Sequence, residues 1–287
     1  MPSVINTNLL SLNAQRNTST SQASLAVSLQ RLSSGLRVNS AKDDAAGLAI
    51  SERLNAQVRG SNVAIRNAND GISLAQTAEG ALAKVNDSLQ RMRELAVQAR
   101  NATNTNADKD SLDKEFGELS KEIQRVLGGT TFNGRAILAA DSGTQTFQVG
   151  ANVTSNDRID VVTTNMTTDA AVTTVAGTDN AGTGRAVIDN TAVGTAIDTV
   201  IGNIDTAINK VSSERATLGA SQNRFDQVIS NLQISVENQS AARSRITDAD
   251  FAQETANLSR ANILQQAGNA MIAQANQIPS QVLSLLR

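Results

Sequence analysis

The residues able to do chemistry in this sequence are few, because it contains neither histidine nor cysteine. Their absence removes imidazole acid–base catalysis, thiol nucleophiles, disulfides and most zinc, haem and iron–sulfur sites. Lys42, Asp43 and Asp44 form the one cluster that could be considered for proton transfer. Acidic residues beside an N-cap such as Ser40 usually interact with the dipole of a helix that begins there. We therefore predict a helix N-terminus at this cluster, and a protein that is not an enzyme.

Two further motifs suggest ligand binding but lack essential parts. Residues 247–250, TDAD, have the spacing of a calcium loop without the central glycine or the distal glutamate of an EF-hand. Gly128 and Gly129, like Gly71, follow no predicted strand and belong to no phosphate-binding pattern. The sequence therefore predicts no metal and no cofactor.

Composition excludes several classes of partner. A net charge of −2 with mixed signs gives no basic footprint for nucleic acid or for a membrane surface. No apolar run reaches the length of a membrane span, and residues 1–22 lack the charged and apolar regions of a Sec signal peptide. The absence of cysteine is what a chain exported in an unfolded state would show.

Apolar residues in alternating steps of four and three predict long helices in the N-terminal half. The first such stripe consists of Leu25, Leu29, Leu32 and Leu36. A long second helix is predicted from residue 45 to 99, followed by a turn at 101–108. A third helix carries apolar residues from Leu112 to Val126 and ends at the two glycines 128 and 129.

The middle of the chain, residues 141–189, is rich in Thr, Gly, Asp and Asn and lacks helical periodicity. Phe147 and Val149 alternate with polar residues on one side of a polar turn, and Ile159 and Val161 do so on the other. This alternation predicts a β-hairpin. Residues 163–190 are compatible with short strands or with a mobile loop.

The C-terminal part returns to helical spacing. From Ile197 to Val236 the four-three pattern is unbroken, with polar residues Arg215 and Gln222 at two of its positions. A last helix carries Leu264, Met271, Ile278 and Leu285 at steps of seven, and we expect this stripe to be buried between chains. The predicted fold is mainly α, a long antiparallel helical rod or coiled coil formed by both termini around a small middle region with a β-hairpin.

Several longer segments make the sequence resemble bacterial flagellins. They are RLSSGLRVNSAKDDAAGLAISERL at 31–54, RNANDGIS at 66–73, LQRMRELAVQA at 89–99, RATLGASQNRF at 215–225 and QANQIPSQVLSLLR at 274–287. The resemblance covers roughly the first 140 and the last 90 residues, with a shorter middle than in flagellins that carry outer domains.

The resemblance implies a domain plan and a function. Residues 1–44 and 247–287 would form an inner terminal coiled coil, 45–140 and 190–246 a helical rod, and 141–189 a hairpin with a variable outer region. The chain would polymerise into the extracellular flagellar filament, support swimming motility and leave the cell through the flagellar type III channel.

The same resemblance implies partners. These are other copies of the chain, an export chaperone, the filament cap and the hook-associated junction proteins. LQRMRELAVQA is similar to the segment that Toll-like receptor 5 recognises, which implies receptor contacts at Arg91, Leu95 and Glu115. The C-terminal QVLSLLR resembles the tail that inflammasome receptors bind.

Two alternatives belong to other classes of protein. A hook-associated junction protein shares the terminal coiled-coil plan but would match the quoted segments loosely. An enzyme carried by the middle region is the second, although this region is short and has no HExxH motif.

Overall fold

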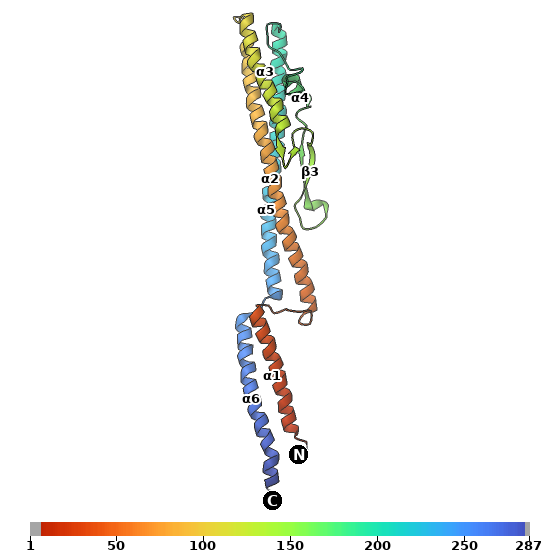
Figure 1. The fold of residues 1–287 in the computed structure, drawn as a ribbon, viewed down its shortest axis with the longest axis vertical. Helices are drawn as coiled ribbons and strands as arrows, with labels where there is room; N and C mark the ends of the chain where they lie inside the picture. Colours follow the sequence, from red (N-terminus) through yellow and green to blue (C-terminus); the bar gives the residue numbers. More distant parts are fainter. Residues whose placement is uncertain (1–6, 285–287) are drawn as a thin grey trace. The chain divides into compact units, whose positions relative to one another are not determined.

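Helices dominate the computed structural model, which describes residues 7–284. The helices are α1 (Leu9–Ser34), α2 (Ala45–Ala99), α3 (Asn106–Gly129), α4 (Ala170–Ala176), α5 (Gly194–Thr247) and α6 (Phe251–Ser284) (Figure 1). Strand β1 (Thr131–Phe132) pairs with β2 (Arg135–Ala136), and β3 (Gly143–Gln148) pairs with β4 (Arg158–Thr163), both antiparallel. The mainly α fold with a middle hairpin is confirmed, and a short 3-10 helix, η1 (Ser155–Asp157), precedes β4.

The chain divides into two compact units. The terminal unit comprises residues 1–58 and 237–287, and the central unit comprises residues 59–236. Helices α1 and α6 pair within the terminal unit. The central unit holds α3, α4, the strands and the longer parts of α2 and α5.

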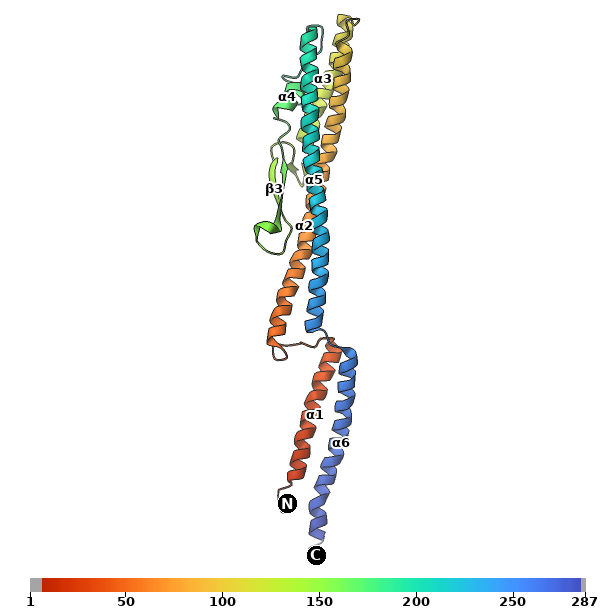
Figure 2. The same ribbon diagram turned by 180° about the vertical axis from the view of Figure 1, so that it is seen from behind.

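Helices α2 and α5 run antiparallel along the central unit (Figure 2). The apolar stripes predicted on them are buried in the core of this unit. Arg93 pairs with Asp205 and Arg100 with Asp198, so residue numbers rise on one helix as they fall on the other. The buried core residues on this seam include Ala68, Ala75, Leu82, Leu89, Ile197, Ile204, Val211 and Leu218. The prediction that residues 197–236 pack mainly within their own chain is confirmed for these positions.

The two polar residues in the α5 stripe share one partner. Arg215 Nη2 lies 3.5 Å from Glu79 Oε1, and Gln222 Nε2 donates to Glu79 Oε2 at 3.1 Å. Because Arg215 and Gln222 are seven residues apart on α5, both can contact the Glu79 carboxylate of α2 in only one alignment of the two helices. Their position agrees with the expectation that polar seam residues fix register.

An aromatic pair is among the contacts that anchor the β3/β4 hairpin to the helices. Phe225 of α5 is fully buried and packs edge-on against Phe147 of β3, with ring centroids 5.6 Å apart. Gly71 of α2 leaves the space that this ring fills, because a Cβ at Gly71 would lie 2.6 Å from Phe225 Cζ. The glycine that interrupts the α2 stripe is therefore a packing notch.

The sequence left residues 163–190 open between short strands and a mobile loop, and the structure shows neither alternative. These residues contain helix α4, whose C-terminal carbonyls accept hydrogen bonds from α3: Ser120 Oγ donates to Ala176 O and Gln124 Nε2 to Gly177 O. Arg185 then forms a bidentate ion pair with the buried carboxylate of Asp113. Sequence periodicity missed this segment because α4 has only seven residues and depends on these tertiary contacts.

The N-terminus of α2 differs from the prediction by its capping residue. Asp44 caps the helix, since its Oδ1 accepts a hydrogen bond from Gly47 N at 2.7 Å. Ser40 instead belongs to the preceding turn, where its N–H and hydroxyl both donate to Asp43 Oδ2. These hydrogen bonds from Ser40 lower the pKa of Asp43. The acidic cluster serves local structure, as the helix-terminus interpretation expected.

Candidate assembly interface

Capping residues begin and end helix α1, and backbone hydrogen bonds beyond its C-terminus connect it to the segment before α6. Asn8 Oδ1 accepts from Ser11 N at 3.1 Å to begin α1, and Gly35, with φ 73°, ends it in the left-handed conformation. Arg37 N donates to Thr247 O at 2.7 Å, and Ala249 N donates to Gly35 O at 2.9 Å. These backbone bonds join the end of α1 and the linker after it to the last residue of α5 and the linker before α6.

Small and polar side chains form the seam between α1 and α6. The buried residues are Ser11, Thr18 and Ser28 on α1 and Glu254, Ala261 and Ala275 on α6. Gly268 lies so close to α1 that a Cβ there would be 2.4 Å from Thr18 Oγ1. Such a seam buries little apolar area, so the pairing of the two helices within one chain gains little from the hydrophobic effect.

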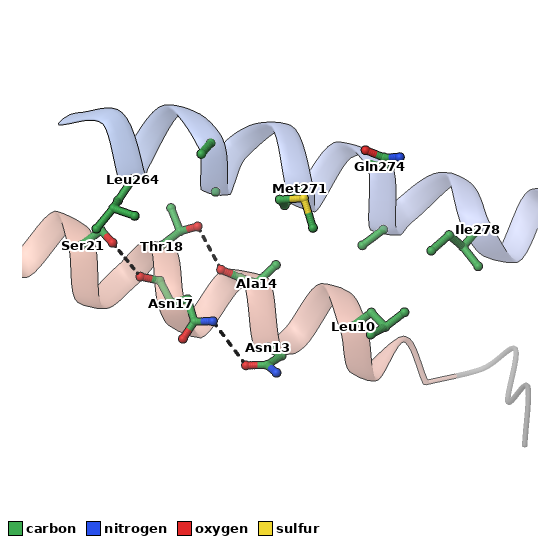
Figure 3. A pocket seen from close by; sticks show the side chains of 13 residues that line it. Leu10, Asn13, Ala14, Asn17, Thr18, Ser21, Leu264, Met271, Gln274 and Ile278 are labelled. Atoms are coloured by element: carbon green, nitrogen blue, oxygen red, sulfur yellow. Dashed lines mark hydrogen bonds between the residues drawn. The ribbon is translucent and has the colours of Figure 1, made fainter. Parts of the chain in front are cut away.

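The large apolar residues of α6 lie beside this seam rather than in it. Leu264 is 51% exposed, Met271 59% and Ile278 42%. Leu264 and Met271 project from α6 toward α1 and, with Leu10 of α1, line an open groove between the helices (Figure 3). Leu285, the fourth predicted member of the stripe, lies outside the described residues.

The predicted leucine stripe of α1 divides between two environments. Leu25 and Leu32 are half-buried, whereas Leu29 is 50% exposed and Leu36 is 37% exposed. Leu36 also forms an isolated antiparallel bridge with Asp248 in the linker before α6. An unpartnered apolar surface therefore accompanies both helices of the pair.

The three residues implied as receptor contacts lie at one place on the central unit but differ in exposure. Arg91 Nε donates to Glu115 Oε1 at 2.8 Å, and Arg91 Nη1 donates to Glu94 Oε2 at 2.9 Å. The hydrogen bonds with Glu115 and then Glu94 raise the pKa of Arg91. Leu95 is only 1% exposed and belongs to the helical core. Arg91 and Glu115 therefore form a surface pair, with Leu95 packed inside the bundle.

Sequence reasoning missed the buried polar contacts of both units. Ser28 and Arg31 of α1 meet Glu254 of α6, and Arg185 meets Asp113. One signal was available for the first contact, because Glu254 is the single acidic residue in the sequence of α6. No pattern in the sequence links Asp113 with Arg185, since they lie 72 positions apart in different kinds of structure.

The contacts that the described residues make are apolar packing, hydrogen bonds and ion pairs. Residues 7–284 contain no cluster of three or more potential metal-ligating side chains. Within the same range, no helix combines the length and apolarity that crossing a bilayer requires. Long paired helices with uncovered apolar side chains are characteristic of structural proteins that associate through helix packing. The fold and surface thus define a helical structural subunit.

Comparison with known proteins specifies that class. Residues 5–146 match the bacterial flagellin N-terminal helical region, and residues 201–286 match the bacterial flagellin C-terminal helical region. A flagellin of Halalkalibacterium halodurans is 47% identical, with 99% of this chain and 100% of that protein covered. A flagellin of Bacillus subtilis is 42% identical, with 99% of each covered. A crystal structure of Bacillus cereus flagellin is 33% identical, covering 58% of this chain and 88% of that chain, with a TM-score of 0.48.

The chain belongs to the bacterial flagellin family, as both terminal matches and the full-length relatives establish. Flagellins are structural proteins that polymerise into the extracellular filament of the flagellum. The hook-associated alternative loses support, because relatives at this identity over nearly the whole chain are flagellins.

Proposed function

We propose that this chain assembles into a swimming-competent flagellar filament by burying the apolar groove of the α1/α6 pair against neighbouring copies. The observation that carries the proposal is the exposed stripe of Leu264, Met271 and Ile278. Side chains of this size are worth about 1.5–3 kcal/mol each when fully buried, so their exposure favours association. In this proposal residues 1–44 and 247–287 form the inner segment, 45–140 and 190–246 the rod, and 141–189 the outer hairpin region.

The remaining partners follow from membership of the family. We infer export through the flagellar type III channel, delivery by an export chaperone, and contact with the cap and the hook-associated junction proteins. Sensing of the C-terminal QVLSLLR segment by inflammasome receptors is part of the same proposal. Secretion of the chain by a strain that keeps the flagellar export channel but lacks its own flagellin, and its loss when that channel is disabled, would test the export route.

Helix content should increase on polymerisation. The α1/α6 seam is built from small polar residues, so it gives the isolated chain little to offset the conformational entropy of ordering two helices. Burial of the groove by neighbouring chains would supply the missing apolar contacts. Far-UV circular dichroism should therefore show more helix per residue in filaments than in monomers. Equal helix content, with protease-resistant ends in the monomer, would contradict this expectation.

A second candidate function, as a ligand of Toll-like receptor 5, rests on the exposed Arg91–Glu115 pair. An arginine at the centre of an interface commonly contributes about 2 kcal/mol or more, which is roughly thirtyfold in affinity. We expect Arg91→Ala to lower receptor activation by folded monomer by that factor, and Glu115→Ala to lower it in the same direction. The assay is reporter-cell signalling at matched monomer concentrations.

The receptor experiment needs two controls. Arg125→Ala removes another exposed arginine that is paired on the surface of α3, so its signalling should stay unchanged. Leu95→Ala opens the core and is informative only if the variant keeps the parent melting temperature. Unchanged activation by both the Arg91 and Glu115 variants would remove these residues from the proposed receptor contact.

A further inference from the structure

The small residues of the α1/α6 seam do not by themselves define one alignment of the two helices. These small residues recur at intervals of seven: the buried Ser11 and Thr18 on α1, with the buried Ala261 and Ala275 and the half-buried Gly268 on α6. If one helix slid by seven residues along the other, an alanine or glycine would again face a serine or threonine. Packing of such side chains discriminates weakly between registers. The alignment therefore depends on more specific contacts: the backbone bonds near Gly35, the bond from Asn8 Nδ2 to Ala275 O at 2.8 Å, and the contacts of Glu254 within the seam.

Glu254 is the exceptional residue of this seam. It is 7% exposed, and both of its carboxylate oxygens have partners on α1. Ser28 Oγ donates to Oε2 at 3.1 Å, and Arg31 Nη1 donates to Oε1 at 3.0 Å. A buried carboxylate that lost these donors would be left desolvated and unpaired, which is strongly unfavourable.

Within one heptad of the observed alignment, Arg31 is the only residue of α1 that provides a guanidinium for this carboxylate. Helix α1 contains no acidic residue, and its basic residues are Arg16 and Arg31. A slide of seven residues would place Ser21 and Ser24 opposite Glu254, or else Gly35 and Val38. A contact with Arg16 would require a slide of about two heptads and would leave much of the pair without a partner.

The register also determines the composition of the groove. Leu10 and Ile278 line the same end of it, and Ser21 and Leu264 lie at the other (Figure 3). A slide of seven residues would replace Leu10 by Asn17 beside Ile278, or would move Leu10 past it. Either change breaks the continuity of the apolar lining.

We propose that Glu254, held by Ser28 and Arg31, is a positioning residue for assembly: it sets the register of α1 on α6 and so aligns the groove that a second copy of the chain contacts. This inference rests on the proposed assembly function. The role of Glu254 is then to select one alignment of the helices rather than to add net stability. Replacing a buried charge by an apolar residue often leaves stability unchanged or increases it.

The register can be read by disulfide formation, because the chain has no natural cysteine. Thr18→Cys with Gly268→Cys reports the native register, since an ideal Cβ at 268 lies 3.4 Å from Thr18 Cβ, close to disulfide geometry. Thr18→Cys with Ala261→Cys, or with Ala275→Cys, reports a slide of seven residues in either direction. Denaturing gels separate links within one chain from links between chains.

The test compares these cysteine pairs in seeded filaments with and without Glu254→Leu. In the parent we expect the native pair to link at least about tenfold more than either slid pair. Glu254→Leu makes the seam more apolar, yet we expect it to reduce this selectivity about tenfold or more. The charge swap Glu254→Arg with Arg31→Glu re-creates the ion pair and should restore selectivity. If Glu254→Leu acted only by changing the packing of the seam, the swap would not restore it.

The possible outcomes separate the inference from the proposed function. If the parent chain fails to elongate seeds, the assembly function itself is wrong. If parent filaments form and Glu254→Leu filaments keep the native selectivity, Glu254 does not set the register. If Glu254→Leu chains fail to enter filaments even when diluted into parent chains, recovery of entry by the charge swap supports the inference, and continued exclusion overturns it.

Discussion

Phe225→Ala is expected to lower the free energy of unfolding of the central unit by about 3–5 kcal/mol, the cost typical of truncating a buried phenylalanine. Phe225 is fully buried, fills the notch at Gly71 and packs edge-on against Phe147. The substitution therefore loses apolar burial and an aromatic pair, and it leaves a cavity where α2, α5 and the hairpin meet.

Urea unfolding followed by far-UV circular dichroism measures this loss, since the chain has no tryptophan or tyrosine to report by fluorescence. Phe251→Ala is the matched control, because it deletes the same side chain where it is 56% exposed. We expect the control to change stability by less than about 1 kcal/mol. A similarly small loss for Phe225→Ala would mean that this aromatic contact does not anchor the hairpin.

Deletion of residues 264–287 is expected to abolish filament growth. It removes the whole α6 side of the groove, including Leu264, Met271 and Ile278, and with it the apolar area offered to neighbouring chains. The partners of these three residues along the groove belong to α1, so the central unit should keep its melting temperature. Seeded growth followed by light scattering and electron microscopy gives the assembly readout, and thermal melting gives the stability readout.

The deletion experiment has an internal control. The same seeds must elongate with full-length chain, which shows that their ends are active. Filaments of normal length from the truncated chain would place the assembly contacts elsewhere. Early melting of the central unit would show instead that residues 264–287 stabilise their own chain.

The long helices could be predicted from the sequence because their apolar spacing is strong. The stripes in α2 and α5 have a repeated four-three rhythm, and helix continuity through Gly71 and Gly80 follows from the length of the pattern. Residue 45 as the start of α2 was also predictable, although the cap is Asp44 rather than Ser40. The hairpin followed from alternation around Phe147 and Ile159.

Features that depend on tertiary contacts were not predictable from local patterns. Helix α4 is short, and it is held by the side chains of Ser120 and Gln124. Helix α1 begins at Leu9, well before the leucine stripe at Leu25, because its seam is built from serine, threonine and alanine. A hydrophobic period does not detect a seam made of such residues.

The most direct test of the proposed assembly interface is the critical concentration for seeded growth of Leu264→Ala and Met271→Ala chains, with Ile263→Ala as the matched control. Ile263 is 66% exposed on the same helix but does not line the groove. If neighbouring copies bury the groove, truncating Leu264 or Met271 costs about 2–5 kcal/mol in the polymer, and the critical concentration rises roughly thirtyfold or more. Ile263→Ala should change it by less than about threefold. Equal critical concentrations for the parent and both groove variants would contradict assembly through this groove.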